Sequence, residues 1–200
     1  YNTVDAVIVG RFVGKEALAA VGGSSSQILN LLIGFFTGVA SGAALIVAQY
    51  YGARDAEDSS RSVHTAMILA IASGAIMTVV GILTAPVLLR IMATPEDTMA
   101  DSIVYMRWVY LAMIPGMVYN MGSAILRAVG DSKHPLYFLI ACCLINVVLD
   151  LLFVVTFNMG VAGAAVATAL SQLLSAVMVC WFLARPRTEE SVRLELSKLR

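Results

Sequence analysis

Apolar residues along the chain gather into long runs, which short polar stretches separate. Each complete run reaches the ~20 residues that a helix needs to cross a ~30 Å hydrocarbon core. The alternation of apolar and polar positions that is typical of barrel strands is absent from these runs. Backbone groups in lipid must also be hydrogen-bonded within their own segment. We therefore predict an all-α integral membrane protein whose six transmembrane helices lie at about 1–13, 24–51, 62–90, 102–127, 134–157 and 161–184.

The composition makes the membrane the relevant solvent. Apolar residues make up 60% of the 200 residues and charged residues only 13%, and the mean hydropathy is +0.85. Net charge is zero, so nothing favours a nucleic-acid partner. The chain opens at Tyr1 inside a predicted span and without a basic leader. We therefore expect the N-terminus to be truncated.

Basic residues in the connections predict the orientation. Three predicted connections hold nine of them, and because Lys and Arg favour the cytoplasmic side we assign these connections to the cytoplasm. The opposite side holds Arg11, Lys15 and Arg90, with Arg107 near the start of the fourth helix. Residues 185–200 are predicted to form a cytoplasmic linker that leads onward. The nine are Arg54, Arg61, Arg127, Lys133, Arg185, Arg187, Arg193, Lys198 and Arg200.

Two carboxylates inside predicted spans are the main candidates for chemistry. An ionisable residue in a membrane helix costs ~3 kcal/mol on insertion scales, which makes each one a functional hypothesis. Asp5 lies in the first helix and Asp150 in the fifth. Asn146 lies four residues before Asp150 and so shares its helix face. Thr168, on the sixth helix, is predicted at a similar depth in the outer half of the membrane.

These four side chains support two interpretations. Carboxylate, amide and hydroxyl oxygens suit Na⁺, and two neighbouring carboxylates can share a proton. The plainer alternative is that Asn146, Asp150 and Thr168 only join two helices by hydrogen bonds. The depth and spacing of the residues leave both open.

Four runs of the sequence carry a likeness to a known family. They are VDAVIVGR at Val4–Arg11, ALAAVG at Ala17–Gly22, AQYYGA at Ala48–Ala53, and LRAVGD at Leu126–Asp131, which continues to Pro135. In their order and spacing, over essentially the whole chain, they resemble the multidrug and toxic compound extrusion (MATE) transporters.

The resemblance implies a twelve-helix transporter of two pseudo-symmetric lobes. Residues 1–184 would be the N-terminal lobe and 185–200 the linker to a missing C-terminal lobe. The prokaryotic branch has a cation site formed by residues that correspond to Asp5, Asn146, Asp150 and Thr168. Tyr1 and Asn120 match positions that line the drug cavity.

The implied function is antiport by alternating access. Entry of Na⁺ or H⁺ would drive export of amphipathic organic cations and drugs across the cytoplasmic membrane of a bacterium or archaeon. The partners would be the substrate, the lipid bilayer and the second lobe. A Na⁺ ion is the metal expected at the cation site, and no cofactor beyond the coupling ion is expected.

The sequence leaves three alternative hypotheses for the function. A flippase for lipid II or a lipid-linked oligosaccharide has the same architecture, but its pyrophosphate cargo calls for basic residues in the cavity, and the intramembrane charges here are acidic. A membrane enzyme would need a nucleophile or metal cluster, and no such motif is found in the sequence. A self-sufficient six-helix scaffold would leave the acidic pair unexplained.

Overall fold

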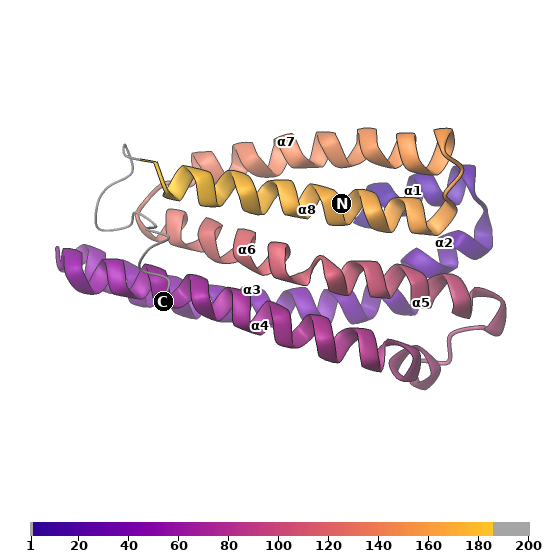
Figure 1. Ribbon diagram of the computed structural model, residues 1–200, viewed down its shortest axis with the longest axis horizontal. Coiled ribbons are helices and arrows are strands. Elements are labelled where there is room, and N and C mark those ends of the chain that lie inside the picture. Colours follow the sequence, from indigo (N-terminus) through magenta and orange to yellow (C-terminus); the bar gives the residue numbers. More distant parts are fainter. Residues whose placement is uncertain (1, 186–200) are drawn as a thin grey trace.

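The computed structural model describes the backbone of residues 2–185 and the side chains of residues 5–185. All regular elements in this part are helical (Figure 1), which confirms the predicted all-α fold. In chain order they are α1 Asn2–Phe12, α2 Lys15–Gly22, α3 Ser24–Gly52, α4 Ala56–Ile91, α5 Glu96–Leu111, α6 Met113–Ala128, α7 Lys133–Asp150, the π-helix η1 Leu151–Thr156, and α8 Gly160–Leu183.

The long helices run side by side, and their connections gather at two ends. Figure 1 shows the α3–α4 and α6–α7 connections at one end, and the α1–α2, α4–α5 and α7–α8 connections at the other. The two basic connections that the structure describes therefore lie at the same end, as the predicted orientation requires. Among the described residues, four segments are long and apolar enough to cross a membrane, and the bent pair α5–α6 would make a fifth. Helix α1 contributes 11 residues.

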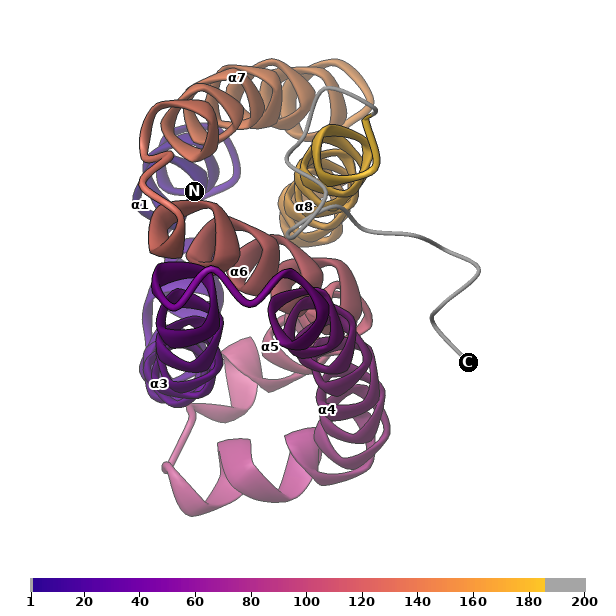
Figure 2. The ribbon, with the colours of Figure 1, turned by 90° about the vertical axis from the view of Figure 1, so that its left-hand side faces the viewer.

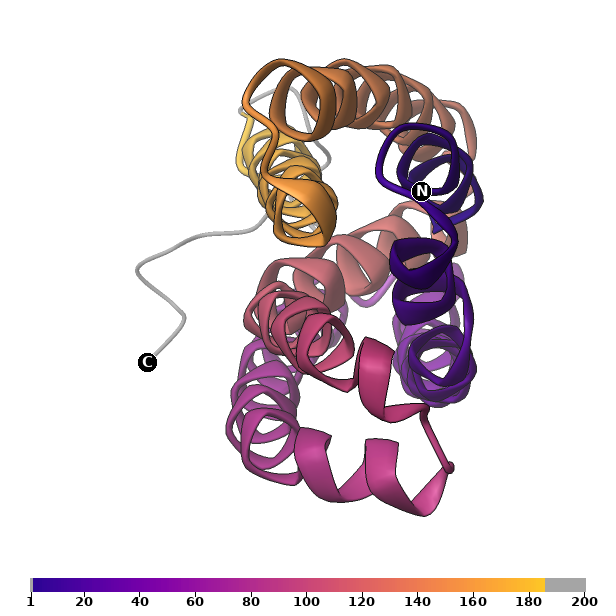
Figure 3. The ribbon, with the colours of Figure 1, turned by 90° about the vertical axis from the view of Figure 1, so that its right-hand side faces the viewer.

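Helix α6 occupies the centre of the arrangement. It packs against α3 and α4 on one side and against α8 on another, and the end views show α1, α7 and α8 grouped beyond it (Figures 2 and 3). Its Met117 and Met121 are buried, as are Tyr105, Met106 and Tyr110 of α5. Bulky side chains on these two helices thus fill the core around which the others assemble.

A short extra helix, α2, lies in the connection that the sequence predicted between the first two spans, at 1–13 and 24–51. Its sequence, KEALAAVG, is rich in Ala and Leu, which are strong helix formers. Gly14 separates it from α1 and has φ 132°, a conformation open to glycine but costly for other residues. The chain therefore turns sharply and resumes a helix before α3.

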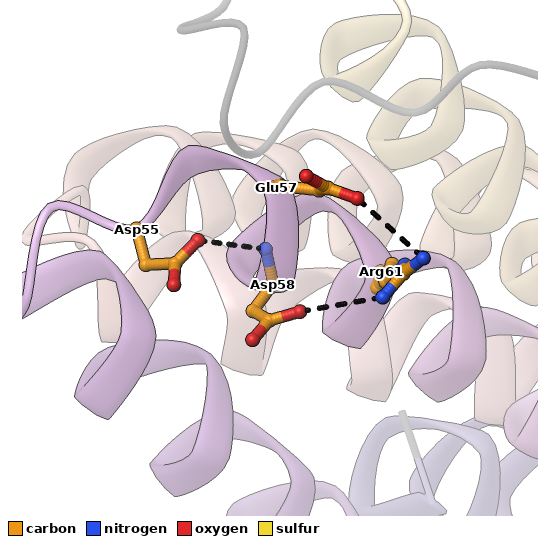
Figure 4. A network of polar contacts seen from close by, with 4 residues as sticks. All are labelled: Asp55, Glu57, Asp58 and Arg61. Carbon is orange, nitrogen blue, oxygen red and sulfur yellow. Dashed lines mark hydrogen bonds and ion pairs between the residues drawn. The ribbon is translucent and has the colours of Figure 1, made fainter.

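Two helices begin earlier than predicted. Helix α4 begins at Ala56, not near residue 62, because the Asp55 carboxylate accepts a hydrogen bond from the Asp58 amide at 3.0 Å and caps the helix. Arg61 pairs with Glu57 at 3.5 Å and with Asp58 at 3.7 Å in the same turns (Figure 4). Helix α5 likewise begins at Glu96, not near 102. The apolar runs predicted the apolar middle of each helix, whereas both helices begin in the acidic stretch before it, at Glu57 and Asp58 in α4 and at Glu96 and Asp97 in α5.

The fourth predicted span is broken. Helices α5 and α6 meet at a bend of 47° around Ala112, close to Pro115 and Gly116, two residue types that weaken a helix. Proline has no N–H and leaves a carbonyl of the preceding turn unpaired. The Thr78 hydroxyl of α4 donates to the nearby Tyr110 carbonyl at 2.7 Å, so α4 stabilises the bent backbone.

Two glycines of α4 allow this close approach. A Cβ built on Gly74 would lie 2.9 Å from the Ile114 Cα, and one on Gly81 would overlap the Tyr110 ring. By contrast, Gly34, Gly38 and Gly42 recur every four residues on α3, and a Cβ on any of them would meet nothing within 4 Å among the described residues. These three glycines therefore make no close helix contact within the described part of the chain.

We expect Gly74→Ala to destabilise the bundle by ~1–3 kcal/mol, because the new methyl group meets backbone that cannot rotate away. Gly52→Ala is the matched control, since its Cβ would meet nothing within 4 Å. Thermal unfolding in detergent would compare the two variants. Equal melting temperatures would show that the α4–α6 contact is looser than described.

Candidate functional site

The four polar residues singled out by the sequence meet in the interior. Asp5 comes from α1, Asn146 and Asp150 from α7, and Thr168 from α8, and each is at most 1% exposed. One helical turn separates Asn146 from Asp150, so both lie on the same face of α7. Helix α1 packs against both α7 and α8. The predicted depth match thus becomes direct contact between three helices.

Thr168 links the other members of the group. Its hydroxyl donates a hydrogen bond to Asp5 Oδ2 at 2.6 Å, the length of a strong bond to a carboxylate. Asn146 Nδ2 approaches the Thr168 oxygen at 3.5 Å, which is long enough to be a weak bond. The hydroxyl therefore accepts from α7 and donates to α1 at the same time.

Several oxygens in this group find no donor. Asp5 Oδ1, Asn146 Oδ1 and both Asp150 oxygens are buried and make no hydrogen bond to a protein group. The Asp5 and Asp150 carboxyl groups are close enough to interact with each other, but two carboxylates offer only acceptors. Since unpaired buried oxygens are costly, the group suits a species that brings positive charge or a proton.

The oxygen ligands of these four residues limit which cation the site can hold. Among the described residues, no group of three or more His, Cys, Asp or Glu side chains is placed to hold a metal ion. Two carboxylates, an amide oxygen and a hydroxyl are hard oxygen ligands. They fit a monovalent hard cation such as Na⁺, or a proton held between the carboxyls.

Tyr105 is a neighbour of the site that the sequence analysis missed. It lies on α5 with 0% exposure, and its hydroxyl makes no hydrogen bond to a described group. The hydroxyl is close enough to Asp5 and Asp150 to interact with both electrostatically. A buried tyrosine usually pairs its O–H. This general tendency was the only feature by which the sequence could have identified Tyr105. The residue was missed because a tyrosine is common in an apolar run.

A cavity of about 220 Å³ adjoins the site. Asn120, predicted to line a substrate cavity, is part of its wall and donates from Nδ2 to the Gly116 carbonyl at 2.9 Å. Thr168 lines this cavity as well, so one residue borders both the cavity and the carboxyl pair. Tyr1, the other predicted cavity residue, lies outside the described residues. The lining residues are Leu29, Ile33, Phe36, Val109, Met113, Gly116, Met117, Tyr119, Asn120, Leu139, Thr168, Gln172 and Ser175.

Comparison with known proteins gives consistent matches. A family model described as MatE matches residues 1–152. A Bacillus subtilis relative, "Probable multidrug resistance protein YoeA", is 33% identical over 184 residues, which cover 90% of this chain and 40% of the relative. Another relative from the same organism, "Probable multidrug resistance protein YpnP", is 31% identical over 172 residues, which cover 86% of this chain and 38% of that relative.

A solved structure matches the fold closely. "Crystal structure of MATE in the bent conformation" has a TM-score of 0.92 and 28% identity, covering 99% of this chain and 44% of that one. The chain therefore spans less than half the length of the relatives and the structure that it matches.

We expect dicyclohexylcarbodiimide, an apolar reagent that modifies protonated carboxyl groups within membranes, to label the buried pair. The variant with both Asp5→Asn and Asp150→Asn should lose most of the label, whereas Asp101→Asn, at an exposed position on α5, should retain it. Mass spectrometry of the labelled peptides gives the measurement. Labelling that survives the double substitution would show that the buried carboxyls carry no accessible proton.

Proposed function

Because the chain belongs to the MatE family, whose model matches residues 1–152, we propose that it is the N-terminal half of a cation-coupled multidrug antiporter. As a member of that family the chain is part of a multi-pass membrane transporter, not an enzyme. The observation that carries the coupling proposal is the contact of Thr168 with both the Asp5 carboxylate and the cavity.

The cation would act on the carboxyl pair. Na⁺ or H⁺ entering from outside would satisfy the unpaired oxygens of Asp5 and Asp150. This binding favours whichever arrangement of α1, α7 and α8 brings those oxygens closest together. Since a ligand shifts a conformational equilibrium only by its difference in affinity for the two states, a second arrangement must hold the carboxyls farther apart. Movement of α1 relative to α7 and α8 is the simplest way to separate them.

The proposed substrates are amphipathic organic cations. Support comes from the apolar wall of the cavity, where Phe36, Met113 and Met117 offer the polarizable surface that such molecules favour. The nearby buried charges are acidic. The relatives named as multidrug resistance proteins belong to the same family.

The cavity lining counts against a flippase for pyrophosphate-linked lipids. Its thirteen residues contain no Lys, Arg or His, and a buried pyrophosphate without a cationic partner would be strongly disfavoured. The family matches also favour multidrug export over this alternative.

The complete transporter requires a partner lobe. The chain spans less than half of its relatives, and the central substrate path of a two-lobed carrier lies between its halves. We therefore propose that a second helical lobe completes the antiporter in the cytoplasmic membrane of a bacterium or archaeon.

We expect Asp150→Asn in the complete transporter to reduce efflux of ethidium at least about tenfold, because an amide cannot hold the coupling cation by charge and one lost charge contact exceeds ~1.4 kcal/mol. Fluorescence of loaded cells at matched membrane expression gives the rate. Repeating the assay without Na⁺, and then with a collapsed proton gradient, identifies the coupling ion.

Asp101→Asn serves as the matched control, since Asp101 is exposed on α5, and it should retain efflux. If the Asp150→Asn variant exports ethidium at the wild-type rate, the Asp150 carboxyl group has only a structural role. Absence of ethidium efflux in the wild type would argue against the proposed substrate class.

A further inference from the structure

A separate groove lies between α3 and α4. It has a volume of about 300 Å³ and shares no residue with the cation site or the substrate cavity. The two helices are antiparallel neighbours joined by a short turn at 53–55. Its lining residues are Ala43, Ile46 and Tyr50 from α3, and Asp58, Arg61, Ser62, Thr65, Ala66 and Leu69 from α4.

Polarity changes along this groove. Tyr50, Asp58 and Arg61 lie near the connecting turn, whereas Ala43 and Leu69 lie deeper along the helices. Asp58 and Leu69 are 11 positions apart on α4, which corresponds to ~16 Å of helix. A phospholipid has the same order over that length, with a charged headgroup followed by acyl chain.

The turn beside the groove belongs to the end assigned to the cytoplasm. This assignment places the polar mouth at the headgroup level of the inner leaflet. Tyr50 is 38% exposed there, and Ile46 and Leu69 are 50% and 46% exposed. Tyrosine is enriched at this level of a bilayer, and exposed aliphatic side chains below it suit acyl chains.

Charges at the mouth select among lipids. The exposed ion pairs of Arg61 with Glu57 and Asp58 are 3.5 and 3.7 Å long (Figure 4), so they are weak and can exchange partners. Residues 54–61 contain two cations, Arg54 and Arg61, and three anions, Asp55, Glu57 and Asp58, so this segment has a net charge of −1. This net negative charge does not attract an anionic headgroup. A zwitterionic headgroup, by contrast, can pair its phosphate with a cation and its ammonium with an anion.

We propose that the α3–α4 groove binds phosphatidylethanolamine from the inner leaflet, with the phosphate on Arg61 and the primary ammonium on Asp58. An ammonium group donates three hydrogen bonds to carboxylates, whereas the quaternary ammonium of choline donates none. The groove therefore prefers ethanolamine to choline headgroups. One acyl chain extends along Ile46 and Leu69 into the apolar part. This inference is independent of the proposed transport function.

Native mass spectrometry of the complete transporter, with equal additions of phosphatidylethanolamine, phosphatidylcholine or phosphatidylglycerol, tests the proposal. We expect phosphatidylethanolamine to be retained about tenfold more tightly than the other two. Arg61→Gln should remove that preference, because a neutral amide cannot pair with phosphate by charge. Arg90→Gln, at the exposed far end of the same helix, should keep it.

Ala43→Leu provides a second variant that leaves every charge in place. It fills the apolar part of the groove and should weaken retention of phosphatidylethanolamine several-fold if the acyl chain occupies that part. Equal retention of the three lipids, preferential retention of phosphatidylglycerol, or no effect of either groove variant would overturn the proposal. Crosslinks from Ile46 to the second lobe would also overturn it, because they would show that this lobe, and not a lipid, covers the groove.

Discussion

The hydrogen bond between Thr168 and Asp5 ties the first helix to the last one described. The partners are 163 positions apart in the sequence and fully removed from solvent. The Asp5 carboxylate of α1 would be strongly disfavoured in an apolar bundle without a partner. The positions of α1, α7 and α8 therefore depend on how the polar group between them is satisfied. Packing around α6 supplies the rest of the frame.

Sequence reasoning found the members of this group because they violate the surrounding pattern. A carboxylate in an apolar run stands out, as Asp5 and Asp150 do, and a spacing of four places Asn146 beside one of them. Tyr105 escaped because tyrosine fits an apolar run without contradiction. Thr78 escaped for a different reason, since its bond to the Tyr110 carbonyl depends on a contact between two helices. No local pattern encodes such a contact.

The backbone beside Asp150 departs from a regular helix where the sequence predicted one continuous span. Residues 151–156 form a π-helix, whose wider turns often occur at functional sites. The start of α8 holds this segment closely, because Met159 N donates to the Phe153 carbonyl at 3.0 Å and a Cβ on Gly163 would lie 3.0 Å from the Phe153 carbonyl carbon. Apolar periodicity cannot distinguish a π-turn from an α-turn, so only the packed structure reveals it.

In the proposed transport cycle the Thr168 hydroxyl limits the coupling free energy between the cation site and the substrate cavity, because it borders both. It has one proton to donate, and that proton is committed to Asp5. A cation or proton on the carboxyl pair would weaken that acceptor and leave the hydroxyl available to the cavity. Exchanging one hydrogen bond to a charged group is worth ~1.5–3 kcal/mol, which lies within the usual range of coupling between two sites. Any larger coupling must come from movement of α1 itself.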